Sequence, residues 1–115
     1  MRDASAITGY HAHVYYDPDT RELAGQIRAG LEAFTVELGR WHDRPIGPHP
    51  KPMYQVAFAP DQFAQVVPWL MLNRAGLCIL VHPITGDDVA DHDVNPLWLG
   101  DRLPIDLEFL RRHTT

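Results

Sequence analysis

Residues 10–16 have the sequence Tyr10-His11-Ala12-His13-Val14-Tyr15-Tyr16, in which two sets of side chains alternate. Alternation with a period of two is typical of a β-strand that has one buried face. His11 and His13 then share one face of the strand, and Ala12 and Val14 share the other. Residues i and i+2 of a strand lie roughly 6.5–7 Å apart, so two imidazoles on one face can bind the same ion. The alternative is that two polar side chains lie on a solvated strand face.

The segments that follow this strand predict an alternation of strands and helices. After a strand at 8–16, Asp17-Pro18-Asp19-Thr20 start a helix, along which apolar residues recur at helical spacing from Leu23 to Phe34. Strands are predicted at 35–43, at 53–59 and at 77–82, with a second helix before the last of them. The order strand, helix, strand, strand, helix, strand is that of a ferredoxin-like βαββαβ fold. The sequence therefore predicts the α+β class, with an antiparallel sheet and a C-terminal extension.

The length of 115 residues suits a single domain, 1–115. We expect its core at about 8–82 and a packed tail at about 83–110, because that tail is too apolar to be disordered. In a ferredoxin-like sheet the helices cover one face only. The other face needs cover from the tail or from a second subunit, so we expect a homodimer.

Composition and charge exclude several kinds of partner. The formal net charge of -5 and the lack of a basic patch argue against nucleic acid. No apolar run approaches the roughly 20 residues needed to cross a membrane. The residues after Met1 lack the apolar core of a signal peptide, and Cys78 is the only cysteine. We therefore expect a cytoplasmic protein.

Seven histidines in 115 residues are a high content, and the predicted fold brings several of them together. His82 ends the strand adjacent to the one that carries His11 and His13. Two imidazoles from one strand and one from its neighbour can form a three-histidine metal site with an open position for water or substrate. These three residues are the predicted metal ligands.

Four further side chains are expected near the same cleft. His49 lies between two prolines in a stiff loop, and its side-chain type suits an acid–base role; a solvated loop histidine is the alternative. Arg74 could bind a substrate carboxylate, although a cation at a helix C-terminus is common. Tyr15 lies on the histidine face and is either a proton donor or an interface aromatic. His92 follows His82 by ten residues and could fold back onto the site.

Several motifs, in the same order along the chain, resemble those of the DOPA 4,5-dioxygenase family. The resemblance runs from Tyr10 to about Gly100 and covers nearly the whole chain. The motifs are Tyr10-His11-Ala12-His13-Val14-Tyr15-Tyr16, Gly47-Pro48-His49-Pro50, Trp69-Leu70-Met71-Leu72-Asn73-Arg74, Leu80-Val81-His82-Pro83, Thr85-Gly86, Asp91-His92 and Trp98-Leu99-Gly100. His11, His13, His49 and His82 match the motif histidines of the family.

The resemblance implies an extradiol, ring-cleaving dioxygenase that acts on a catechol such as DOPA, with O2 and non-haem Fe(II) or another divalent metal. Such Fe(II) sites commonly use two histidines and one carboxylate. Here the site is either all-histidine or receives a carboxylate from the tail (Asp87, Asp88 or Asp91) or from a second subunit. We expect His11, His13 and His82 to bind the iron and His49 to act in proton transfer. Arg74, Tyr15 and His92 are the expected substrate-binding residues. The alternative function is a non-catalytic, dimeric ferredoxin-like module that binds a small ligand.

Overall fold

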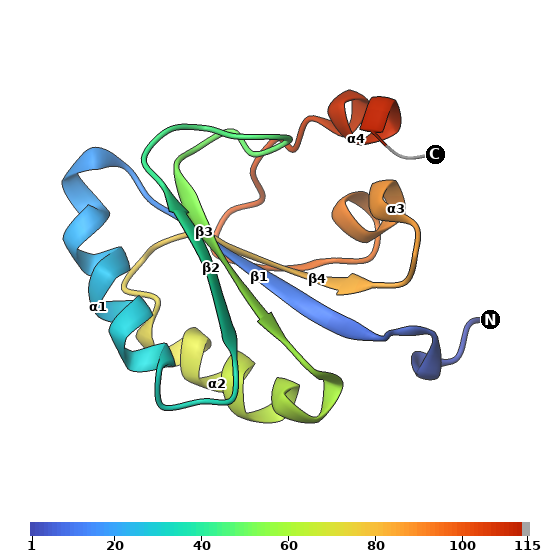
Figure 1. Ribbon diagram of the computed structural model, residues 1–115, viewed down its shortest axis with the longest axis horizontal. Helices are drawn as coiled ribbons and strands as arrows, with labels where there is room; N and C mark the ends of the chain where they lie inside the picture. Colours follow the sequence, from blue (N-terminus) through green and yellow to red (C-terminus); the bar gives the residue numbers. More distant parts are fainter. Residues whose placement is uncertain (114–115) are drawn as a thin grey trace.

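The structure is a computed structural model that describes residues 1–113. Its centre is a five-stranded sheet with helices on both sides (Figure 1). The strand order is β2-β3-β1-β4-β5, and every neighbouring pair is antiparallel. In chain order the elements are the 3-10 turn η1 (Ala4–Ala6), β1 (Gly9–Tyr15), η2 (Pro18–Thr20), α1 (Arg21–Leu31), β2 (Glu37–His42), β3 (Met53–Phe58), η3 (Pro60–Gln62), α2 (Phe63–Asn73), β4 (Ile79–Ile84), α3 (Asp88–Asp93), β5 (Leu97–Leu99) and α4 (Leu107–His113).

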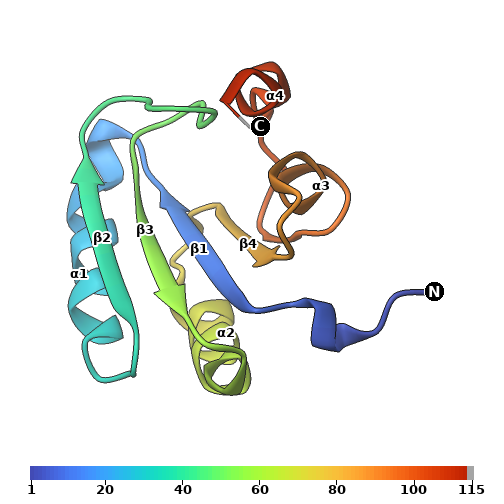
Figure 2. The same ribbon diagram turned by 45° about the vertical axis from the view of Figure 1, so that its right-hand side comes forward.

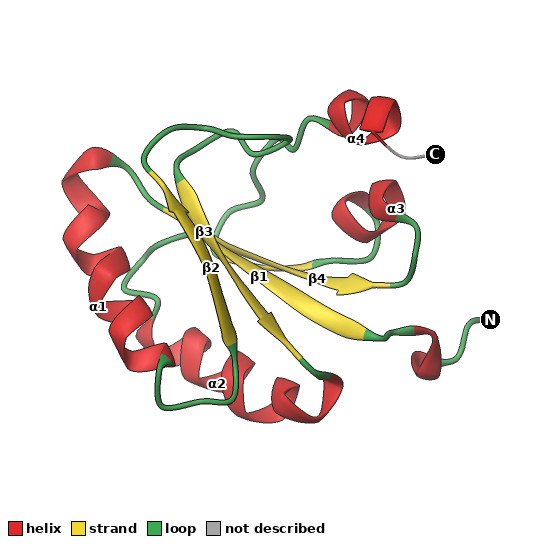
Figure 3. Cartoon of the chain, in the orientation of Figure 1, coloured by secondary structure: helices red, strands yellow, loops and turns green. Residues whose placement is uncertain are grey.

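One face of the sheet carries the main hydrophobic core. In α1, the buried residues Ala24, Ile27 and Leu31 are spaced three and four apart, which places them on one side of the helix. They pack against Ala12 and Val14 of β1, both fully buried. Helices α1 and α2 lie together on this side of the sheet (Figure 3). The alternation along β1 therefore sends one set of side chains into this core and the histidines to the opposite face.

The opposite face is covered by the segment that follows β4. Figure 2 shows α3 and α4 on the side of the sheet away from α1 and α2. Between them, β5 pairs with β4 and extends the sheet by three residues. A second, smaller apolar cluster forms here, made of Tyr15, Met53 and Leu80 with Cys78, Trp98, Leu103 and Ile105 packed against them. The tail thus packs on the sheet of its own chain.

The ferredoxin-like order of strands and helices is confirmed, with three differences in detail. Helix α1 ends at Leu31, so Phe34, predicted as the last apolar residue of the helix, lies beyond it. The second strand is shorter than the predicted 35–43, because Asp43 leaves the strand and its carboxylate accepts hydrogen bonds from Arg21 and Tyr16. Strand β5 was not predicted, since three residues are too few to show an alternating pattern. Within residues 1–113, no helix is both long and apolar enough to cross a membrane.

Candidate metal centre

Three histidines converge from two adjacent strands on the covered face of the sheet. His11 of β1 and His82 of β4 are direct partners in the antiparallel ladder, and His13 lies two residues further along β1. Each offers a ring nitrogen, and these nitrogens all lie within 4.8 Å of one another. His13 and His82 are the closest pair, with their Nε2 atoms 3.1 Å apart. The strand pairing therefore brings together the three residues that the sequence predicted as ligands.

The backbone sets the orientation of the His82 ring. Its Nδ1 lies 2.9 Å from the carbonyl oxygen of Pro83, which can only accept, so Nδ1 carries the hydrogen and donates it. The unprotonated nitrogen is then Nε2, which points toward His13. The Nδ1 of His13 is buried and has no hydrogen-bond partner among the described residues. Two buried imidazole nitrogens thus face each other, and at most one hydrogen can lie between them.

This arrangement fits a divalent metal ion. Two nitrogens that each lie about 2.1 Å from one ion are at most about 4.2 Å apart, and the 3.1 Å between His13 and His82 is within that limit. His11 is only half-buried, so its ring has room to rotate toward the same point. Imidazole nitrogens suit zinc, copper, iron and nickel, and the donor set therefore favours a transition metal over magnesium or calcium.

Two further imidazoles line the opposite wall of this site. The Pro-rich loop before β3 carries His49, whose ring centre lies 4.3 Å from that of His13. Helix α3 carries His92, whose ring centre lies 4.0 Å from that of His82. The Nδ1 of His92 donates to the carbonyl oxygen of Asp88 at 2.7 Å, which leaves Nε2 as its free nitrogen. The sequence suggested that His92 could fold back onto the site, and in the structure His92 lines the same cavity.

Burial keeps the inner histidines in their neutral form. Burial, together with a smaller effect of the nearby His92, lowers the pKa of His82 to about 3 and that of His49 to about 4. Burial also holds the pKa of His13 well below its ordinary value, and His49 and His82 add to the effect. Neutral imidazole is the form that binds metal. Near neutral pH, His13 and His82 are therefore in the form that binds a metal ion, and His49 is an uncharged imidazole.

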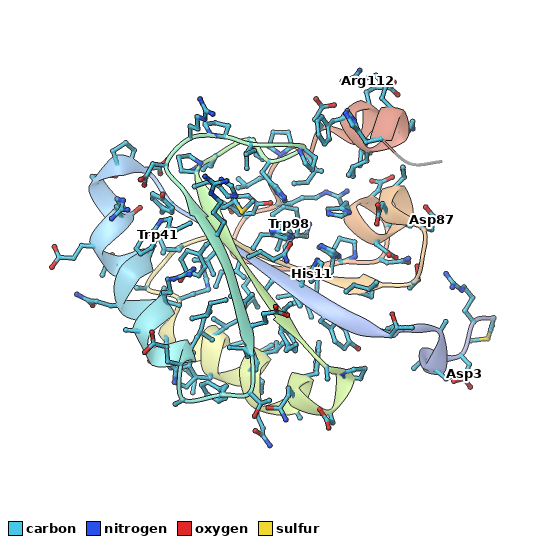
Figure 4. All side chains as sticks on the ribbon, in the orientation of Figure 1. Asp3, His11, Trp41, Asp87, Trp98 and Arg112 are labelled. Carbon is cyan, nitrogen blue, oxygen red and sulfur yellow. The ribbon has the colours of Figure 1, made fainter. Side chains whose placement is uncertain are left out.

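The five imidazoles surround a cavity of about 240 Å³. Clefts that bind drug-sized molecules have volumes of roughly 300–1,000 Å³, so this cavity suits a single-ring compound. A larger hollow of about 450 Å³ lies at one end of the sheet, but no histidine lines it. Figure 4 shows His11 between the sheet and the C-terminal helices. The lining residues are His11, His13, Pro48, His49, Gln55, His82, Ile84, Asp88, Asp91, His92 and Leu110.

Not all of the predicted substrate residues reach this cavity. The guanidinium of Arg74 donates to the carbonyl oxygen of Leu77 at 3.0 Å, and Arg74 does not line the cavity. Tyr15 is 1% exposed and lies behind His49, with its hydroxyl 2.7 Å from His49 Nδ1. Gln55 lines the cavity although the sequence did not suggest it. Its position opposite His13 becomes evident only when the register of β1 and β3 is known.

The three tail carboxylates differ in their availability to a metal. Asp87 accepts from the backbone N–H of Ala90 and caps α3. Asp91 is almost fully buried, and its two oxygens accept from the backbone N–H of Thr85 at 2.8 Å and from its hydroxyl at 2.6 Å. Asp88 lines the cavity, and among the described residues its carboxylate makes no hydrogen bond or salt bridge. Of the three, Asp88 is therefore the carboxylate free to turn toward the histidines.

The chain is similar to proteins of one family. Residues 10–109 match the Dopa 4,5-dioxygenase family. An uncharacterised 21.2 kDa protein of Botryotinia fuckeliana is 36% identical, over 94% of this chain and 67% of that protein. A DOPA 4,5-dioxygenase of Amanita muscaria is 31% identical, over 90% of this chain and 50% of that protein. This chain thus spans about two thirds and one half of their lengths. A solved structure from Nostoc punctiforme, described as a candidate dioxygenase, has 61% identity and a TM-score of 0.96, covering 97% of this chain and 98% of that one.

Proposed function

Because this chain belongs to the Dopa 4,5-dioxygenase family, we propose that it is an extradiol dioxygenase that cleaves the ring of a catechol such as DOPA. The observation that carries the proposal is the convergence of His11, His13 and His82 within 4.8 Å at the bottom of a small cavity. A family whose name denotes dioxygenases implies O2 and a small organic substrate. The cavity volume is consistent with one aromatic ring.

His11, His13 and His82 are the proposed ligands of a non-haem iron(II). Bound iron would supply the redox chemistry that lets O2 react with a catechol. The chain itself contributes neutral imidazoles held in place by the β1–β4 ladder and by the Pro83 carbonyl. It also excludes bulk water, because His13 and His82 are each 3% exposed. Asp88 is the carboxylate that could complete the ligand set from the tail.

His49 and His92 are the proposed residues that contact the substrate. They come from two different segments on the wall opposite the strand histidines, with ring centres 6.3 Å apart. We assign a hydrogen bond to the catechol oxygens to His49, in place of the proton transfer expected from the sequence, and we assign substrate contact to His92 through its free Nε2. Neither assignment needs Arg74, whose hydrogen bond to Leu77 holds it elsewhere.

We further propose that the protein is a homodimer in the cytoplasm, where the free thiol of Cys78 stays reduced. The competing function is a non-catalytic module in which the same histidines only line a ligand cavity. The buried Nε2 atoms of His13 and His82, 3.1 Å apart, favour the enzyme. A bound metal ion would be coordinated by both nitrogens, whereas a cavity that only binds a polar ligand does not need two nitrogens so close together.

Metal content tests the ligand assignment. Iron-loaded wild-type protein should retain metal after desalting, and His13→Ala should lose it, because one of three ligands is gone. His113→Ala is the matched control, since His113 is exposed on α4 and outside the cavity. His49→Ala should retain iron. If His49→Ala empties the site while His13→Ala does not, the ligand set is wrong.

Oxygen consumption tests the reaction. Anaerobically iron-loaded protein, supplied with O2 and a panel of catechols that includes DOPA, should consume O2 and form a yellow semialdehyde. His49→Ala should lower kcat by about 10²–10³-fold, the usual effect of removing a hydrogen-bond donor that stabilises charge developing on a substrate oxygen. If wild-type protein that retains iron consumes no O2 with any catechol, the binding-module function replaces the enzyme.

A further inference from the structure

Tyr15 is a buried phenol directly behind His49. Its side chain is 1% exposed, and its ring stacks on Trp98 with ring centres 6.2 Å apart and an interplanar angle of 16°. The hydroxyl oxygen lies 2.7 Å from Nδ1 of His49. Among the described residues, this nitrogen is the only hydrogen-bond partner of the Tyr15 hydroxyl. Tyr15 does not line the cavity, so it cannot touch a molecule bound there.

The direction of this hydrogen bond follows from the burial of both groups. If Nδ1 of His49 carried the hydrogen, it would donate to the Tyr15 oxygen, and the phenol hydrogen would be buried without an acceptor. A buried, unsatisfied donor is costly, so this arrangement is disfavoured. The phenol therefore donates to an unprotonated Nδ1. In a neutral imidazole the hydrogen is then on Nε2.

We propose that Tyr15 is a positioning residue that fixes His49 in the Nε2–H tautomer and thereby presents an N–H donor to the cavity. The tautomer itself follows from the buried hydrogen bond, whereas the role of the N–H toward a catechol oxygen rests on the proposed function. A fixed donor can stabilise negative charge that develops on a substrate oxygen during reaction. His49 thus acts toward the substrate as a donor and not as a base.

Tyr15 is suited to holding a hydrogen bond and poorly suited to supplying a proton. Burial raises the pKa of Tyr15 above its ordinary range, with a smaller effect from Cys78. Transfer of the phenol proton to His49 would leave a buried tyrosinate, which that environment disfavours. The stacking on Trp98 fixes the ring, so the position of the hydroxyl does not depend on a bound ligand.

Nitrogen-15 NMR of the histidine side chains tests this proposal directly, since it distinguishes protonated from unprotonated ring nitrogens. The full chain is measured near neutral pH with Zn²⁺, a diamagnetic divalent ion, and the His49 signals are identified by their loss in His49→Gln. In wild type, Nε2 of His49 should be protonated and Nδ1 unprotonated. In Tyr15→Phe, which keeps the stack on Trp98, both tautomers should be populated.

Tyr16→Phe is the matched control. It removes the phenol of the next residue, which follows β1, packs in the main core and donates to the backbone carbonyl of His42. This variant should leave the His49 tautomer unchanged. Protonated Nδ1 in wild type would overturn the proposal, even if Tyr15→Phe failed to fold. An unchanged, single Nε2–H tautomer in folded Tyr15→Phe would overturn it as well.

Kinetics give a second readout that a purely structural role would not produce. Tyr15→Phe that retains its metal should lower kcat about tenfold while KM stays within about twofold, the scale of one net hydrogen bond. Equal loss in Tyr16→Phe would contradict the positioning role. An inactive wild type with the expected tautomer would refute the proposed function and leave the tautomer assignment in place.

Discussion

At the scale of single residues, the buried histidines make the stability of the metal-free protein depend on pH. The pKa of His82 is lowered to about 3, that of His49 to about 4, and that of His13 well below its ordinary value. The unfolded chain binds protons at these residues from about pH 6.5 downward, and the folded chain does not. The free energy of unfolding should be highest above pH 6.5 and fall between pH 6.5 and 5, by up to about 4 kcal/mol per pH unit when all three contribute.

Urea unfolding of the protein in the presence of a chelator, at several pH values between 7.5 and 5, measures this slope. His49→Gln removes one such group, so it should reduce the slope by about a third. The control His113→Gln, at an exposed position, should not change it. A free energy of unfolding that is flat between pH 6.5 and 5 would show that these histidines are not buried in neutral form.

At the scale of elements, the short helix α3 depends on one buried carboxylate. Asp91 is 1% exposed and joins α3 to the end of β4 through two hydrogen bonds from Thr85. Asp91→Asn should lower the free energy of unfolding by about 1–3 kcal/mol, because the neutral amide keeps only one accepting oxygen and loses the negative charge that strengthens both bonds. Since α3 carries His92, amide hydrogen exchange of α3 should also become faster.

The control for this variant is Asp93→Asn on the same helix. Asp93 pairs with Arg102 at 3.1 Å, but that carboxylate is 36% exposed and such surface pairs contribute about 0–1 kcal/mol. Both variants remove one negative charge, so the comparison separates the loss of a buried carboxylate, Asp91, from the loss of a partly exposed one, Asp93. Similar losses of stability in the two variants would mean that the Asp91–Thr85 contacts do not hold α3 in place.

At the scale of the whole molecule, the position of the tail changes where a dimer interface is expected. The sheet face that the sequence left uncovered is covered by α3, β5 and α4 of the same chain, so a second subunit would meet the outer surface of the tail. Light scattering should give twice 13.1 kDa, about 26 kDa. Val94→Asp, at a residue of the tail that is 75% exposed, should shift the protein toward a monomer.

Leu72→Asp serves as the comparison for that variant. Leu72 is 86% exposed on α2, on the other side of the sheet, and its replacement should leave the mass unchanged. A wild-type mass of 13.1 kDa at high protein concentration would rule out the dimer. Dissociation by Leu72→Asp and not by Val94→Asp would move the interface to the helices of the core.

Part of the candidate site could be predicted from local patterns in the sequence, and part of it follows only from the tertiary structure. Alternation along residues 10–16 predicted that His11 and His13 share a face, because successive side chains of any strand point to opposite sides. The βαββαβ order predicted that the fourth strand pairs with the first, and the ladder places His82 directly opposite His11. These inferences need only periodicity and connection rules, and both are properties of the linear chain.

Other parts of the site depend on contacts between segments far apart in the sequence. Arg74 resembled a substrate residue in the sequence, yet its hydrogen bond to Leu77 holds it outside the cavity. The three residues of β5 are a strand only because β4 offers an open edge for pairing. The bond between Tyr15 and His49 joins residues 34 positions apart, and it exists because Trp98 and the proline loop close over the same face. Periodicity determines which way a side chain points, and only the tertiary structure decides what it meets there.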